Sequence, residues 1–217
     1  MSDERQTTTD APPIAIIDYG MGNLRSVQKG MERVGFAAEV TRDHQRIEAA
    51  AGVVLPGVGA FGACMDNLRT YGLINTVRRV IERGTPFLGI CLGMQLLFEE
   101  SEEFGRIPGL GVLRGRVVRF QDQPDLKVPH IGWNQITKRQ DPPHLRGLDD
   151  GAFVYFVHSY YVVPTDPALT ATSTSYGVEF TSAIARDNVF ATQYHPEKSQ
   201  AVGLKILENF GRFVEER

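Results

Sequence analysis

The first ninety residues alternate between short apolar segments and amphipathic segments, and this alternation constrains the fold more than any other feature. Short apolar runs bounded by Gly or Pro are typical of buried strands, and apolar residues at helical spacing indicate helices. Helices between successive strands give parallel connections, so the pattern predicts an α/β fold with a mostly parallel central sheet flanked by helices. We expect strands at 13–18, 37–41, 52–57 and 86–90, and helices at 24–35 and at 71–84, where Gly84 ends the second helix.

From about residue 112 the sequence changes to a succession of strand-like segments. These lie at 114–120, 128–139, 152–163, 168–176 and 182–195, with a hairpin turn at Asp187 and Asn188, and an amphipathic helix is expected at 201–216. The C-terminal half should therefore be β-rich and partly antiparallel. We expect one domain over residues 13–217, preceded by a polar, disordered tail at 1–12.

Charge and hydropathy exclude several classes of protein. The 217 residues are 42% hydrophobic with a formal net charge of −3, so the basic surface of a nucleic-acid-binding protein is missing. No apolar stretch approaches the roughly 20 residues that cross a bilayer, and the polar N-terminus lacks the apolar core of a secretory signal. The sequence predicts a soluble, cytoplasmic protein.

The cysteines and glycine-rich loops give no sign of a metal or a cofactor. Cys64 and Cys91 are 27 positions apart, which suits neither a disulfide framework nor a zinc site. The loop at 55–62 lacks the Lys-Ser/Thr of a phosphate-binding P-loop, and Arg25 replaces the third glycine that a dinucleotide-binding loop needs. We therefore expect no metal and no cofactor.

Cys91 has the setting of a nucleophile. The pattern Gly-Ile-Cys-Leu-Gly at 89–93 lies where a strand ends and a helix begins, as in a nucleophile elbow. The glycines allow a sharp turn, and the helix start favours thiolate over thiol. The alternative is a buried structural cysteine beside packing glycines, which is how we interpret Cys64.

His195 and Glu197 can supply a base and its orienting group. In an extended segment, residues two apart face the same way, so Glu197 can reach one imidazole nitrogen while the other faces the thiol. Pro196 should keep the segment extended. Cys91, His195 and Glu197 thus form a possible catalytic triad, the alternative being a surface histidine beside a solvated carboxylate.

A thiolate nucleophile also needs donors for the oxyanion that forms during acyl transfer. The N–H of Leu92, directly after the nucleophile, is one candidate. The loop at 55–62 is suited to supply the other from Val58 or Gly59, because Gly57 and Gly59 let the backbone approach a substrate closely.

Five segments together resemble the class I glutamine amidotransferases, and among them the glutaminase subunits of imidazole glycerol phosphate synthase from histidine biosynthesis. They cover 16–27, 56–62, 89–99, 128–134 and 194–199, and the resemblance extends from about residue 13 to the C-terminus. It implies that Cys91 attacks the side-chain amide of glutamine, leaving a thioester that water hydrolyses. It also implies a substrate pocket formed by Gly57, Gln95, Ser159 and Tyr160.

The same resemblance implies a partner, a cyclase subunit with a (β/α)8-barrel fold that receives the ammonia in a heterodimer. Trp133 and Lys198 are the candidate docking residues, since an aromatic anchor with a nearby charge is a frequent hot-spot composition. Core packing for Trp133 and a solvated charge for Lys198 are the alternatives. Two other functions stay open at this point: a subunit of a different amidotransferase, and a non-enzymatic scaffold that keeps the fold.

Overall fold

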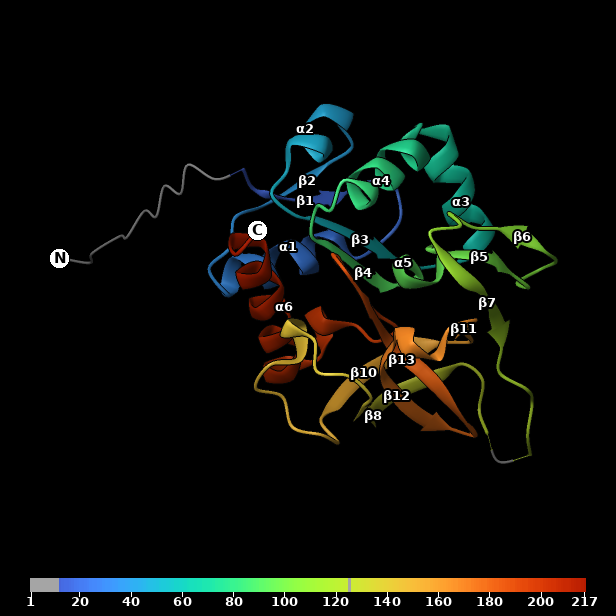
Figure 1. Ribbon diagram of the computed structural model, residues 1–217. Coiled ribbons are helices and arrows are strands. Elements are labelled where there is room, and N and C mark those ends of the chain that lie inside the picture. The colour runs from blue at the N-terminus through green and yellow to red at the C-terminus, as the bar shows by residue number, and fades with distance from the viewer. Residues whose placement is uncertain (1–11, 125) are drawn as a thin grey trace.

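The computed structural model describes residues 12–124 and 126–217 (Figure 1). The tail expected at 1–12 therefore lies, apart from Pro12, outside the described residues. In the first half, the expected strands and helices form close to their predicted bounds, and helices α2 and α3 are additional. The elements are β1 (Ile14–Ile17), α1 (Leu24–Arg33), β2 (Ala38–Thr41), α2 (His44–Ala49), β3 (Val53–Gly57), α3 (Phe61–Thr70), α4 (Leu73–Glu82) and β4 (Phe87–Cys91).

The parallel part of the sheet has the strand order β2-β1-β3-β4-β14, where β14 (Val189–Thr192) comes from the far end of the chain. In this register Gly57 pairs with Cys91, and Thr192 pairs with Ile90. The carboxyl ends of neighbouring parallel strands share one edge of a sheet. The segments that follow β3, β4 and β14 therefore meet, although β14 comes about 100 residues after β4 in the sequence.

Helices cover both faces of this parallel part. Helices α2, α3 and α4 lie on one side, and α1 lies with the C-terminal helix α6 (Gln200–Glu215) on the other (Figure 1). Successive side chains of a strand point to opposite faces. Ile17 accordingly packs in the core under α2, α3 and α4, whereas Ile16 packs in the core under α1 and α6. The predicted fold class is confirmed.

Antiparallel strands extend the sheet in the C-terminal half. They include β13 (Val178–Arg186), which pairs with β14 through the predicted turn at 187–188, where Asp187 has a φ of +53°. The remaining elements are α5 (Leu92–Gln95), β5 (Phe98–Ser101), β6 (Ile107–Pro108), β7 (Leu113–Arg119), β8 (His130–Gln135), β9 (Thr137–Lys138), β10 (Phe153–His158), β11 (Tyr160–Pro164) and β12 (Thr170–Tyr176). Strands β8 and β10 form a separate two-stranded sheet.

The strands expected at 128–139 and 152–163 are each divided in two. The second divides at Ser159, between β10 in the small sheet and β11 in the large one. The carbonyl of Ser159 accepts a hydrogen bond from the N–H of Phe120, which ties this crossing point to the end of β7. Pairing with two different sheets therefore breaks a segment that is continuous in its apolar pattern.

Two negative findings apply to residues 12–124 and 126–217. None of the helices there combines the length and the apolarity that crossing a bilayer requires. Within the same residues, no group of three or more His, Cys, Asp or Glu side chains is arranged to hold a metal ion.

His144, which lies between β9 and β10, is buried. Only 3% of its surface is exposed, and its ring stacks on Phe190 with centroids 4.4 Å apart and an interplanar angle of 1°. Neither ring nitrogen has a hydrogen-bond partner among the described residues. Burial lowers the pKa of His144 to about 4, because a charged imidazolium loses its hydration there.

Acid should therefore destabilise the protein in part through His144. Between about pH 6.5 and pH 4 the unfolded chain binds a proton at this residue and the folded chain does not, so folding stability is present above pH 6.5 and is lost as the pH falls. We expect His144→Leu to reduce the drop in unfolding free energy between pH 7.5 and pH 5.0 by about 2 kcal/mol, measured by urea titration. The exposed His44, changed to Leu, is the matched control. An unchanged pH dependence in His144→Leu would contradict this account.

Candidate active site

Cys91 lies where β4 ends and α5 begins, and the backbone there is strained. Its φ of +55° is in the left-handed region, which residues with a Cβ rarely adopt. The two flanking glycines leave no room for side chains. A Cβ on Gly93 would lie 1.8 Å from the carbonyl oxygen of Leu55, and a Cβ on Gly89 would lie 2.9 Å from the Cβ of Ala191. The spacing of the two glycines around Cys91 is thus a steric requirement of this turn.

The helix after Cys91 is shorter than the sequence indicates. It contains only Leu92–Gln95, and the chain then enters β5. The carbonyl of Leu96 accepts a hydrogen bond from the N–H of Leu110, and the carbonyl of Leu97 accepts from two residues at 112 and 113. This pairing ends the helix after about one turn, so the helix dipole favours the thiolate less than a long helix would.

His195 follows β14 and forms a buried pair with Glu197. Its Nδ1 lies 2.8 Å from Oε1 of Glu197, and at most 2% of either side chain is exposed. The sequence predicted that this segment is extended, and that prediction is wrong for residues 196–198. They form a 3₁₀ turn, in which the N–H of Lys198 donates to the carbonyl of His195. The hydroxyl of Ser199 donates to the same carbonyl at 2.7 Å. A turn, rather than a strand, therefore brings the carboxylate to the imidazole.

The pKa of His195 reflects opposing influences. Burial favours the neutral ring, whereas the nearby sulfur of Cys91 and the carboxylate of Glu197 both favour the charged ring, and the pKa rises to about 10. The second ring nitrogen, Nε2, is buried and has no hydrogen-bond partner among the described residues. The surroundings of His195 thus favour the charged ring that forms when this residue takes up a proton.

A cavity of about 430 Å³ is lined by Cys91 and His195 together with most of the other residues singled out in the sequence. Gly57 is not in its wall. A Cβ on Gly57 would lie 2.8 Å from the Cβ of Leu92, so this glycine permits close packing behind the site. The cavity is lined by Val58, Gly59, Cys91, Leu92, Gln95, Glu103, Pro129, Val157, His158, Ser159, Tyr160, His195 and Lys198.

The loop between β3 and α3 is held at several points. Gly59 has a φ of +95°, and the carbonyl of Val58 accepts a hydrogen bond from the Sγ of Cys64 at 3.6 Å. The hydroxyl of Tyr19 donates to the carbonyl of Pro56 at 2.8 Å. Cys64, interpreted from the sequence as a small core residue, is indeed buried, and it also contacts this loop.

Trp133 is outside the cavity and about half-exposed, so it is not a core residue. It lies on β8, and its ring meets the ring of Tyr155 edge-on, with centroids 6.1 Å apart. Two other exposed apolar side chains on this small sheet are Ile131 and Phe153. We call Ile131, Trp133 and Phe153 the apolar patch. Lys198, which lines the cavity, has its Nζ 5.9 Å from the centroid of Tyr155, so Tyr155 connects a residue of the cavity wall to Trp133 of the patch.

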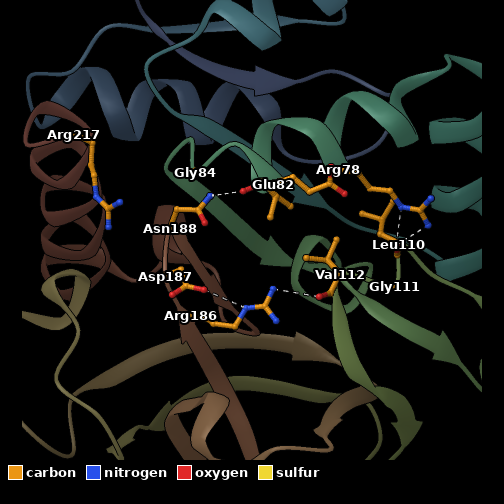
Figure 2. Close-up of a pocket in the computed structure, with 11 residues that line it drawn as sticks. Arg78, Glu82, Gly84, Leu110, Gly111, Val112, Arg186, Asp187, Asn188 and Arg217 are labelled. Atoms are coloured by element: carbon orange, nitrogen blue, oxygen red, sulfur yellow. Dashed lines mark hydrogen bonds and ion pairs between the residues drawn. The ribbon is translucent and has the colours of Figure 1, made fainter.

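A second cavity, of about 650 Å³, lies at the opposite edge of the sheet, near the start of β4 and β14 (Figure 2). Arg78 donates to the carbonyl of Leu110, and Arg186 donates to the carbonyl of Val112. Glu82 and Asp187 add negative charge to the same wall. These arginines thus bind the backbone at 110–112, and the lining holds no Cys, Ser or His that could act as a nucleophile or base.

Gln193 was not among the residues predicted from sequence, yet it is fully buried and its Nε2 lies 3.7 Å from the Sγ of Cys91. His130 and His158 pair across β8 and β10 with ring nitrogens 3.0 Å apart, a contact that their spacing in the sequence does not indicate. The only signal for Gln193 was its place two residues before His195.

Comparison with known proteins gives the class. The family model described as "Glutamine amidotransferase class-I" matches residues 15–212. A solved structure titled "Structure of PurLQS from Thermotoga maritima" superposes with a TM-score of 0.71 at 17% identity, covering 95% of this chain and 98% of that one, and supports the fold alone. The chain belongs to the class I glutamine amidotransferase family.

Curated relatives are more specific. The chain is 60% identical over 91% of its length to "Imidazole glycerol phosphate synthase subunit HisH" of Syntrophotalea carbinolica, covering 98% of that protein. It is 58% identical over 91% of its length to the HisH subunit of Geobacter sulfurreducens, covering 97% of it. Within the amidotransferases, the chain is thus a member of the HisH family, as the resemblance indicated.

Proposed function

We propose that Cys91, His195 and Glu197 hydrolyse glutamine to glutamate and ammonia. His195 Nε2 takes the thiol proton, and the sulfur attacks the side-chain amide carbon. The proton then passes to the departing nitrogen as the C–N bond breaks, and water hydrolyses the remaining thioester. Glu197 holds the ring through Nδ1 and stabilises the imidazolium. The observation that carries the proposal is that the strained Cys91 and His195 line one cavity, with His195 held in a buried pair with Glu197.

The oxyanion of each tetrahedral intermediate would be stabilised by two backbone donors. Leu92 would supply one N–H, and the loop of Val58 and Gly59, which lines the same cavity, would supply the other. Gly57 contributes indirectly, because its missing Cβ lets this loop lie close to Leu92.

Gln95 would bind the amino-acid end of the substrate through its oxygen. Its Nε2 already donates to the carbonyl of Tyr160 and to Oε1 of Gln193, each at 2.9 Å, so both hydrogens are used. The remaining polar atom, Oε1, is an acceptor and suits the substrate's α-ammonium group. Ser159 and Tyr160 line the same cavity and would complete the pocket.

The partner would be the cyclase subunit of imidazole glycerol phosphate synthase, since the relatives are named as a subunit of that enzyme. The apolar patch of Ile131, Trp133 and Phe153 is the docking surface that we assign to it. Ammonia would leave the cavity past Lys198, which lines it, and past Tyr155, which contacts Trp133 of the patch. The cyclase would use it to form imidazole glycerol phosphate.

A glutaminase that supplies a partner should be activated by that partner. We expect the glutaminase kcat to rise by about 10²-fold or more when the cyclase and its own ligand are both present, because one oxyanion donor is worth about 10² to 10³ in rate. The loop around Gly59 is the element that would reorient. The measurement compares the chain alone, with cyclase, and with cyclase plus ligand. Equal kcat in all three would mean a constitutive glutaminase, and no turnover in any of them would refute the proposed reaction.

A further inference from the structure

Gln193 contacts the reacting sulfur and has no part in the triad. It follows β14 directly, is 0% exposed, and donates from Nε2 to the Sγ of Cys91 at 3.7 Å. Buried amides are normally fully hydrogen-bonded, so the partners of this one indicate what it does.

The orientation of the Gln193 amide follows from a single backbone carbonyl. The oxygen of Tyr160 can only accept, so the atom of Gln95 that lies 2.9 Å from it must be the NH₂ group. The same NH₂ group lies 2.9 Å from the amide of Gln193, which must therefore present its oxygen. The NH₂ group of Gln193 is consequently directed at Cys91.

The carbonyl of Tyr160 is itself fixed from the other side. It also accepts a hydrogen bond from Nδ1 of His158 at 2.9 Å, and Nε2 of His158 then accepts from Nδ1 of His130 at 3.0 Å. Nε2 of His130 is left to accept from the side-chain amide of Asn134 at 3.2 Å. Burial lowers the pKa of both histidines, so both stay neutral and keep these tautomers. Reversing the Gln193 amide would place its NH₂ group against that of Gln95. If Gln95 reversed as well, its oxygen would lie against the carbonyl oxygen of Tyr160, which can only accept.

A hydrogen-bond donor at this position favours only one protonation state of the sulfur. An N–H stabilises the thiolate that remains after His195 has taken the proton, and it offers the thiol S–H no acceptor. It also restrains the Cys91 side chain through an atom that is not part of the His195–Glu197 pair.

We propose that Gln193 is a further catalytic residue, whose amide N–H stabilises the Cys91 thiolate and whose orientation is set by Gln95. This inference rests on the proposed function, in which Cys91 is the nucleophile. Gln95 thereby links the substrate pocket to the sulfur, because a substrate ammonium on its Oε1 polarises the NH₂ group that holds Gln193.

The test measures the reactivity of the Cys91 thiol directly, in the absence of glutamine. The rate of Cys91 alkylation by iodoacetamide is followed against pH, with the modified residue identified by mass spectrometry, in the wild type, Gln193→Met and Gln193→Glu. Met has a similar length and no donor, whereas Glu keeps the shape and replaces the donor with oxygen. We expect the pH midpoint of alkylation to rise by about one unit in Gln193→Met and further in Gln193→Glu, with kcat about tenfold lower in Gln193→Met.

Thr192→Val is the matched control. Thr192 is the neighbouring residue, is equally buried, and donates to the carbonyl of Tyr194 rather than to the sulfur. Its alkylation profile should match that of the wild type. Should Gln193→Met fail to fold, Gln193→Glu decides the question.

Two outcomes separate the inference from the function on which it rests. An unchanged alkylation profile in the Gln193 variants, even with a lower kcat, would assign Gln193 to packing and overturn the inference. A wild type that is alkylated at Cys91 but releases no ammonia from glutamine with cyclase and its ligand would instead overturn the proposed function.

Discussion

Replacing Cys91 by Ser should reduce glutamine hydrolysis to background while leaving the fold and the complex with the cyclase intact. A hydroxyl in the same place is a far weaker nucleophile, because its proton is not drawn off at neutral pH as that of the thiol is. Serine differs from cysteine by a single atom and carries the same Cβ into the strained turn, so packing in this buried position changes little. The measurement is ammonia release from glutamine by the complex with the cyclase's ligand present.

The control for Cys91→Ser is the reaction that the cyclase subunit catalyses. When ammonium salt replaces glutamine, the cyclase in the mutant complex should still work at the rate of the wild-type complex. Loss of the ammonium-dependent reaction would show damage to assembly instead of chemistry. Substantial glutaminase activity in Cys91→Ser would remove Cys91 from the role of nucleophile.

Replacing His195 should lower kcat more than replacing Glu197. By analogy with triads in serine hydrolases, we expect His195→Asn to lower kcat by roughly 10⁶-fold and Glu197→Gln by roughly 10⁴-fold. The base moves the proton, whereas the carboxylate holds the ring at 2.8 Å and stabilises its charge. Steady-state kcat and KM for the complex, measured for both variants and the wild type, give the comparison.

The order of these two effects is the critical result. Activity in Glu197→Gln equal to that of the wild type would exclude Glu197 from the mechanism. A larger loss in Glu197→Gln than in His195→Asn would reverse the assigned roles. The thermal unfolding temperature of each variant serves as the control, because both residues are buried and their loss can also weaken the fold.

The two halves of the chain differed in how predictable their fold was. Strands β1, β3 and β4 could be located from sequence, because they are buried at every position and their sequences are continuous apolar runs bounded by Gly or Pro. Strand β2, at the edge of the sheet, is only partly buried and was located by its place in the alternation. Helix α4 ended where expected, just before Gly84, which has a φ of +86°. Strands β5 and β6 escaped notice because they are short and are defined by their pairing partners, not by their own residues.

The sequence by itself determined the local chemistry of this protein: the strained turn at Cys91, its two obligatory glycines, and the family to which the chain belongs. A steric rule over five residues needs no knowledge of the rest of the chain. Only the tertiary structure decided which distant groups reach the sulfur. Gln193 contacts Cys91 because β14 pairs with β4, and its amide points the right way because Tyr160, on another strand, fixes Gln95. The direction of a buried hydrogen bond depends on every partner along it, and those partners are brought together only when the chain folds.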